Sequence, residues 1–200
     1  TLFRSTDFYA AVNSAGAYKL PLILCVVNNG WAISVPRTAQ TGAKTLAQKG
    51  LAGGLYCLQV DGNDLFAVLE GMRRAMDRAR NGEGGTVIEF MTYRLHDHTT
   101  ADDARRYRDD AEVKEWEARD PLRRMTAYLE STGALTEEVS AQIARDAEDV
   151  AQQLRDAMNA ETELDPLELF DHVYSVQTPQ LAAQRAQLAE ELSRSENQEA

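Results

Sequence analysis

The chain has 200 residues, of which 44% are hydrophobic and 26% charged, which suits one domain, or one domain with a helical appendage. No apolar run approaches the ~20 residues that a membrane span needs, and no signal segment opens the chain, so we expect a cytoplasmic protein without membrane partners. The two cysteines, Cys25 and Cys57, lie in apolar stretches without the spacing of a zinc site and are predicted to be buried free thiols.

The formal charge of −11 comes from one part of the chain. Residues 1–119 carry 15 acidic and 15 basic side chains, whereas residues 120–200 carry 17 acidic and 6 basic ones. Because an acidic surface repels nucleic-acid phosphates, we expect no nucleic-acid partner, and an electrostatic partner of residues 120–200 should be basic.

The first half of the chain alternates helical and strand patterns. Residues 5–18 place apolar side chains at helical spacing. The run Leu22–Val27 is apolar at every position, which is typical of a strand covered on both faces in a parallel sheet. Two similar runs, Tyr56–Val60 and Thr86–Tyr93, flank a predicted amphipathic helix at Asp64–Arg80.

This alternation predicts an α/β fold with an open, mostly parallel sheet, flanking helices and right-handed crossovers. Only three strands are predicted, which is fewer than a free-standing doubly wound domain usually has. We therefore expect further strands of this sheet to precede Thr1.

The segment His96–Glu112 is polar and almost without aliphatic residues, which predicts a long surface loop of the kind that often carries function. Beyond it, Asp120-Pro121 opens a predicted helix that ends near Gly133 and buries three apolar side chains. These are Leu122, Met125 and Leu129.

Two further amphipathic helices are predicted at residues 136–159 and 181–192. We therefore divide the chain into a partial α/β domain, residues 1–119, which includes the loop 95–112, and an acidic helical C-terminal extension, residues 120–200.

Three polar clusters follow predicted strands, where ligands bind in open α/β sheets, and the third is the loop His96–Arg108. Asn28-Asn29-Gly30-Trp31 could simply form a turn, or an Asn amide oxygen and a nearby carbonyl could hold the Mg²⁺ of a diphosphate cofactor. Asp61-Gly62-Asn63-Asp64 is interpreted as a strand exit and helix cap.

His98 is the most notable residue of the loop, because a histidine beside a strand end could contact phosphate or shuttle a proton near neutral pH. A solvated surface histidine is the alternative. The sequence contains no Ser/His/Asp order, Walker loop or Gly-x-Gly-x-x-Gly, so hydrolase, P-loop and classical dinucleotide functions have no support.

Several segments in order resemble one family: NNGWAISVPR, VDGNDLFAV, GEGGTVIEFMTYR, YRLHDHTTADDARRYR and LFDHVY. They are similar to the alpha subunit of the thiamine-diphosphate-dependent decarboxylating component of 2-oxo acid dehydrogenase complexes, of pyruvate or branched-chain type. The resemblance implies a thiamine-diphosphate-binding fold and a cofactor held with Mg²⁺ between alpha and beta subunits of an α2β2 heterotetramer. It also implies decarboxylation of a 2-oxo acid and acyl transfer to the lipoyl domain of the acyltransferase component.

The resemblance also assigns roles to individual residues of the Asn28–Trp31 region. Asn29 matches the side-chain ligand of Mg²⁺, and Trp31 matches the position that lends its carbonyl to the metal. Ala32, Ile33 and Ser34 match the stretch that runs alongside the cofactor.

In the loop, His98 matches the histidine that reaches the cofactor and assists acyl transfer, and Arg94 matches the strand-end arginine of the cofactor-binding set. Thr99 stands where animal relatives carry a serine that is phosphorylated to switch the enzyme off.

The sequence departs from the family pattern at the Gly-Asp-Gly motif that carries the acidic Mg²⁺ ligand, because this motif would lie before Thr1. Val27 also stands where some relatives have an arginine. Two hypotheses follow: an alpha subunit that carries half of the cofactor site, or a catalytically inactive truncated subunit that acts only as an assembly module.

Overall fold

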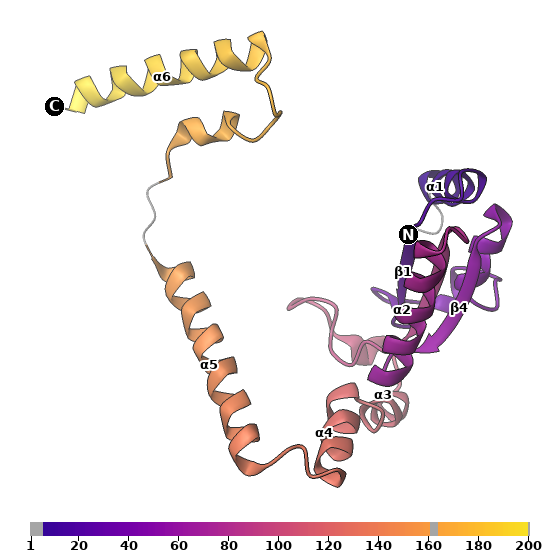
Figure 1. Ribbon diagram of the computed structural model, residues 1–200. Helices are drawn as coiled ribbons and strands as arrows, with labels where there is room; N and C mark the ends of the chain where they lie inside the picture. Colours follow the sequence, from indigo (N-terminus) through magenta and orange to yellow (C-terminus); the bar gives the residue numbers. More distant parts are fainter. Residues whose placement is uncertain (1–5, 161–163, 200) are drawn as a thin grey trace. The chain divides into compact units, whose positions relative to one another are not determined.

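The computed structural model describes residues 6–160 and 164–199, with side chains to residue 194 (Figure 1). The chain divides into two compact units, Thr1–Glu137 and Glu138–Ala200. The boundary after residue 119 that the sequence suggests stays a prediction.

The first unit is built on a three-stranded parallel sheet. Its strands are β1 (Ile23–Asn28), β4 (Tyr56–Asp61) and β5 (Thr86–Met91), in the spatial order β1-β5-β4. The strand β5 is central, and Glu89 pairs in register with Val26 of β1 and Gln59 of β4. The predicted open parallel α/β sheet is confirmed.

Helices cover the two faces of this sheet differently. Helix α1 (Thr6–Ala17) and the 3-10 segment η3 (Ala47–Gly53) pack on one face, and α2 (Leu65–Arg80) packs on the other. Residue 5, the first of the predicted helix, lies outside the described residues.

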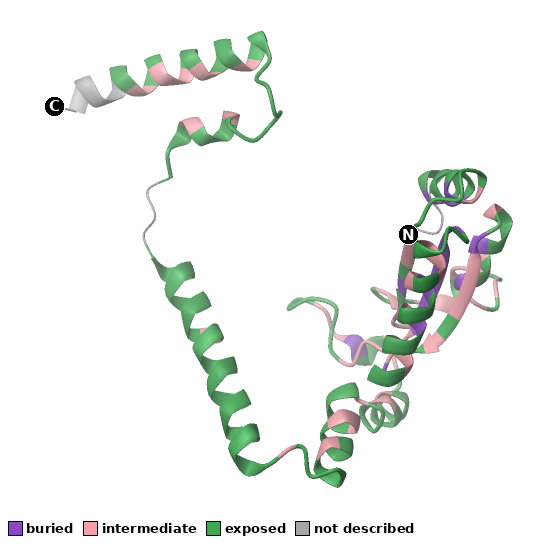
Figure 2. Cartoon of the chain, viewed as in Figure 1, coloured by how far each residue is buried: buried purple, intermediate pink, exposed green. Residues whose placement is uncertain are grey.

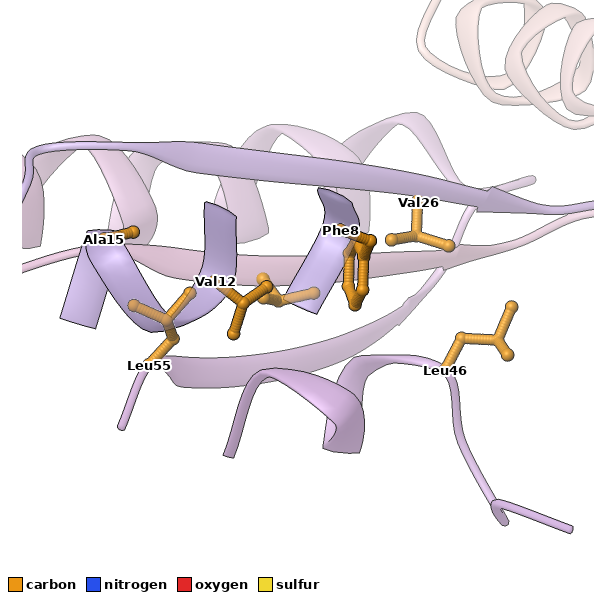
Figure 3. Close-up of a cluster of buried hydrophobic side chains, with 7 residues drawn as sticks. Phe8, Val12, Ala15, Val26, Leu46 and Leu55 are labelled. Atoms are coloured by element: carbon orange, nitrogen blue, oxygen red, sulfur yellow. The ribbon is translucent and has the colours of Figure 1, made fainter. Parts of the chain in front are cut away.

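Figure 3 shows the apolar cluster on the α1 face, where side chains of the helix meet those of β1 and of the segments around η3. Because side chains of a strand alternate between faces, Val87 joins this cluster while Ile88 and Phe90 pack with α2. The cluster consists of Phe8, Val12, Ala15, Val26, Leu46, Leu55 and Val87.

Among the described residues, β1 is an outer strand of the sheet and is only partly covered. The prediction that it is covered on both faces is wrong at Cys25 and Val27, because α2 packs mainly over β4 and β5. Val27 is 67% exposed, and Cys25 is also exposed. The prediction of buried thiols is therefore wrong for Cys25, while Cys57 is half-buried; both cysteines are free.

The remaining elements of the first unit are short. They are β2 (Trp31–Ala32), β3 (Val35–Pro36), η2 (Arg37–Ala39), η4 (Ala104–Arg106), α3 (Asp110–Glu117) and α4 (Pro121–Ser131). The predicted loop His96–Glu112 therefore ends earlier than expected, because Asp109 caps α3 through the N–H of Ala111. Ala104 of this loop is buried.

Helix α4 begins as predicted at Pro121, capped by the Asp120 carboxylate. The prediction that it buries Leu122 is wrong, because the helix contacts Phe66 through Tyr128 and leaves Leu122 77% exposed. Met125 and Leu129 are half-buried.

The second unit contains α5 (Glu137–Asn159), η5 (Pro166–Phe170) and α6 (Pro179–Glu199). Figure 2 shows that α5 is exposed along nearly its whole length, including its apolar stripe. An ion pair between Arg185 and Asp171 joins α6 to the end of η5, with 3.6 Å between nitrogen and oxygen. None of the helices within the described ranges is both long and apolar enough to cross a membrane.

Candidate functional site

The turn after β1 is shaped by two asparagine side chains. Asn28 is buried, and its Oδ1 accepts a hydrogen bond from the backbone N–H of Gly30 at 3.2 Å. Asn29 Oδ1 accepts from the backbone N–H of Trp31 at 3.1 Å. Gly30 has a φ of 83°, a conformation that favours glycine. The turn prediction for these residues is confirmed, and the metal-ligand alternative stays open.

A cavity of about 180 Å³ opens beside this turn, at the carboxyl end of β1. Asn29, Trp31 and Ala32 line it, so three of the predicted site residues share one cavity. The same lining includes Arg37 and Lys49, which the sequence did not single out. These two side chains bring positive charge to a cavity with hard amide oxygens, which suits an anionic ligand with a bound cation.

The two cationic residues are themselves held in place by hydrogen bonds. Arg37 Nη1 donates to the carbonyl of Ala43 at 2.9 Å, and Lys49 Nζ donates to Tyr9 Oη at 3.1 Å. Both residues come from the chain segment that follows the β2–β3 hairpin, and the backbone N–H of Arg37 donates to the carbonyl of Gly30 at 2.8 Å, which joins this segment to the turn.

Ile33 and Ser34 form the two-residue tip of the antiparallel β2–β3 hairpin. Both are exposed, and Ile33 has a φ of 56°, which is rare for a β-branched residue. Neither side chain lines the cavity. The structure thus separates these two predicted residues from Asn29, Trp31 and Ala32.

Arg94 joins the hairpin tip to the loop. Its Nη2 donates to the carbonyl of Ile33 and to Tyr107 Oη, each at 2.8 Å. The ring of Tyr107 in turn lies 5.4 Å from that of Trp31, centroid to centroid. The predicted residue Arg94 therefore contacts the Trp31–Ser34 stretch directly.

The loop around His98 is closed by a carboxylate. Asp102 accepts a hydrogen bond from the backbone N–H of His98 at 2.9 Å and another from Tyr107 Oη. These hydrogen bonds hold the pKa of Asp102 below its ordinary value, and the bond from Tyr107 contributes most. Partial burial and the same bond raise the pKa of Tyr107.

His98 and Thr99 are exposed, and neither lines the cavity. The hydrogen bonds of Asp102, Tyr107 and Arg94 connect the His98 backbone to the hairpin, but the imidazole itself lies outside the cavity lining. The role of His98 stays a prediction.

The cluster Asp61–Asp64 acts as predicted, as a strand exit and helix cap. Asp64 Oδ1 accepts from the N–H groups of Phe66 and Ala67 at the start of α2. Arg124 of α4 bridges Asp61 and Asp64 at 2.8 and 2.7 Å. Although burial alone would raise it, the hydrogen bond from Arg124 brings the pKa of Asp61 below its ordinary value.

Sequence reasoning missed Glu89, which is fully buried in the middle of β5. Its carboxylate binds Asn28 of the turn and the backbone at the start of η3. The sequence did contain a feature that could have identified Glu89, because a single acidic residue inside the apolar run TVIEF is unusual in a buried strand. Among the residues that the structure describes, no three His, Cys, Asp or Glu side chains cluster as a metal site.

Comparison with known proteins shows what this chain is similar to. Residues 4–166 match the protein family described as "Dehydrogenase E1 component". A 3-methyl-2-oxobutanoate dehydrogenase subunit alpha from Mycobacterium tuberculosis is 42% identical over 190 residues, covering 95% of this chain and 52% of the relative.

Two relatives carry the name pyruvate dehydrogenase E1 component subunit alpha. The one from Acholeplasma laidlawii is 40% identical over 185 residues, covering 89% of this chain and 52% of its own length. The one from Staphylococcus aureus is 46% identical over 157 residues, covering 78% and 42% respectively. The chain spans about half the length of the relatives that it matches.

Proposed function

Because the chain belongs to the dehydrogenase E1 component family, we propose that it is part of an alpha subunit that decarboxylates a 2-oxo acid with thiamine diphosphate and Mg²⁺. The names of its relatives support pyruvate or a branched-chain 2-oxo acid such as 3-methyl-2-oxobutanoate as the substrate. The observation that carries the proposal is the cavity at the end of β1, lined by Asn29, Trp31 and Ala32.

The residues of this cavity fit the diphosphate end of such a cofactor. Asn29 Oδ1 and the Trp31 carbonyl are hard oxygen ligands suited to Mg²⁺. Arg37 and Lys49 line the same cavity and would balance the charge of a diphosphate. When bound, thiamine diphosphate supplies the chemistry that releases CO₂, and the protein supplies binding and orientation.

The cofactor-binding stretch continues through Ala32, Ile33 and Ser34, and Arg94 stabilises it by binding the carbonyl of Ile33. His98 sits on a loop that the same arginine anchors through Tyr107. The backbone N–H of His98 binds Asp102, and its imidazole is the group that would hold or move a proton during acyl transfer to lipoyl. Thr99 beside it stands at the position of the phosphorylated serine that the resemblance places in animal relatives.

The proposal includes the partners that an alpha subunit of this family needs. A beta subunit would complete an α2β2 heterotetramer with a thiamine-diphosphate-binding fold, and the lipoyl domain of an acyltransferase component would receive the acyl group. We place this assembly in the cytoplasm. The alternative is a catalytically inactive assembly module. The exposed apolar stripe of α5 suits a protein contact in either case, because exposed apolar surface often marks such a contact.

A dye-reduction assay with the protein and a beta subunit separates the two. We expect dye reduction that depends on pyruvate or 3-methyl-2-oxobutanoate, and the faster acid identifies the substrate class. Asn29→Ala should abolish it, because the metal loses its side-chain ligand, whereas Asn13→Ala on the exposed face of α1 should not. If neither acid reduces the dye, the enzyme proposal fails and the assembly module is favoured.

A further inference from the structure

Glu89 is a carboxylate in the centre of the sheet with no exposed surface. Its Oε1 accepts from Asn28 Nδ2 at 2.7 Å. Its Oε2 accepts from the backbone N–H groups of Leu46 at 2.7 Å and Ala47 at 3.0 Å, and from Gln59 Nε2 at 3.1 Å. The neighbouring residues of β5, Ile88 and Phe90, are apolar and buried.

All four of these partners are N–H donors, so they match a carboxylate, which accepts at both oxygens, better than a protonated acid or an amide. Burying a charge is costly unless hydrogen bonds compensate it. Charge-assisted bonds to four donors provide this compensation and fix each donor group in place.

The groups that Glu89 binds belong to two chain segments that line the cavity. Asn28 belongs to the turn that carries Asn29 and Trp31, and its other atom, Oδ1, shapes that turn through Gly30. Leu46 belongs to the segment that leads into η3, and it lines the cavity together with Asn28. One carboxylate therefore joins the Asn28–Trp31 turn to the segment that carries Lys49.

We propose that Glu89 is the positioning residue of the cofactor cavity, holding the Asn28–Trp31 turn at a fixed distance from the segment around Leu46. This inference rests on the proposed function. Glu89 lies inside the sheet and would orient Asn29 without contacting it. Outer partners of this kind typically contribute roughly 10–100-fold to metal affinity.

Glu89→Gln tests the inference with minimal change of shape. A glutamine can keep one acceptor for Leu46 and Ala47, but its NH₂ group then faces the NH₂ group of Asn28. If Asn28 turns its amide over to relieve this contact, it presents a donor to the N–H of Gly30. The substitution should therefore disturb the turn and leave the contacts at residues 46 and 47 in place.

The double variant Asn28→Asp with Glu89→Gln should restore the turn. The carboxylate that it introduces at position 28 accepts from the glutamine NH₂ group with one oxygen and from the Gly30 N–H with the other. Val87→Ala serves as a matched control, since Val87 is buried on the same strand face and its loss weakens the core without a polar contact to the turn.

Two measurements on the protein assembled with a beta subunit test the positioning role of Glu89. Amide hydrogen exchange without cofactor should be faster at Gly30 and Trp31 in Glu89→Gln, normal in the double variant, and unchanged at these positions in Val87→Ala. Calorimetric titration with Mg²⁺ and thiamine diphosphate should give roughly 10–100-fold weaker binding in Glu89→Gln, with recovery in the double variant.

Unchanged exchange at Gly30 in Glu89→Gln, or unchanged cofactor affinity despite faster exchange, would overturn the positioning role. Equal losses of affinity in Val87→Ala and Glu89→Gln would also overturn it, because the effect would then be general destabilisation. If the wild-type protein binds no cofactor but exchange responds as expected, the proposed function fails while the link between Glu89 and the turn is supported.

Discussion

Two adjacent asparagines at the end of β1 have different environments. Asn28 continues the strand alternation, faces the α1 side of the sheet and binds Glu89 and Gly30 with its two amide atoms. Asn29, one residue later, is half-buried and lines the cavity. Both residues line the cavity, but Glu89 and Gly30 engage the two amide atoms of Asn28. Asn29 is therefore the better placed of the two to meet a ligand.

The carboxylate of Asp102 gives the loop a pH dependence. Its folded-state pKa lies below the ordinary value of 3.8, with the Tyr107 hydroxyl as the first cause. The ionised form therefore favours the closed loop above pH 3.8, and this contribution is lost as the pH falls through the lowered pKa.

Tyr107→Phe should raise the pKa of Asp102 toward 3.8 and speed amide exchange at His98, because the carboxylate loses the hydroxyl and its link to Arg94. The carboxyl chemical shift of Asp102, followed by NMR across acidic pH, measures this. Tyr18→Phe, at an exposed tyrosine of the first unit, is the control. An Asp102 titration curve that is the same with and without the Tyr107 hydroxyl would contradict the assignment.

At the scale of elements, α1 and η3 approach each other so closely that only glycine fits between them. A Cβ atom at Gly16 would lie 1.6 Å from the carbonyl oxygen of Gly53. The obstacle is backbone, which cannot move aside as a flexible side chain can. This close approach brings η3, and with it the backbone donors for Glu89, against the sheet.

Gly16→Ala should therefore destabilise the fold by about 1–3 kcal/mol, as overpacking does. The intrinsic helical preference for alanine over glycine acts in the opposite direction but contributes only roughly 0.5–1 kcal/mol. Chemical denaturation measures the balance, with Ser14→Ala on the exposed side of α1 as the control. A midpoint equal to or above that of the wild type would show that the two elements separate freely.

The regular elements were predictable from the sequence because their patterns are long. The helix Leu65–Arg80 and the strand Tyr56–Asp61 lie within one residue of the predicted bounds. The hairpin Trp31–Pro36 and η3 were not predicted, since strands of two residues are too short to show a pattern and η3 has neither a continuous apolar run nor the length of a regular helix. The predicted burial of Val27 was wrong for another reason. The residues of a strand do not show whether the strand lies in the centre of its sheet or on its outer side.

For the candidate site, the sequence located the turn at Asn29 because polar residues after a buried strand mark a ligand edge. It did not identify the other residues that surround this turn. Arg37 and Lys49 lie in the short 3-10 segments η2 and η3, and Glu89 is brought to Asn28 only by the pairing of β1 with β5. Such contacts depend on sheet order, which the pattern of single strands does not specify.

At the scale of the whole molecule, the site lies in the first unit, on the neutral part of the chain. Its cavity walls come from three places: the β1 turn, the β2–β3 hairpin and the segment that leads into η3. If this cavity binds the Mg²⁺ and diphosphate end of the cofactor as proposed, the segments that line it should change when the cofactor binds.

Hydrogen–deuterium exchange of the assembled protein, with and without Mg²⁺ and thiamine diphosphate, is the most direct test. We predict slower exchange on binding in residues 28–34 and in the loop 95–108, with no change in α6. If exchange slows elsewhere but not in residues 28–34, or does not change anywhere in the first unit, the cofactor does not bind at this cavity.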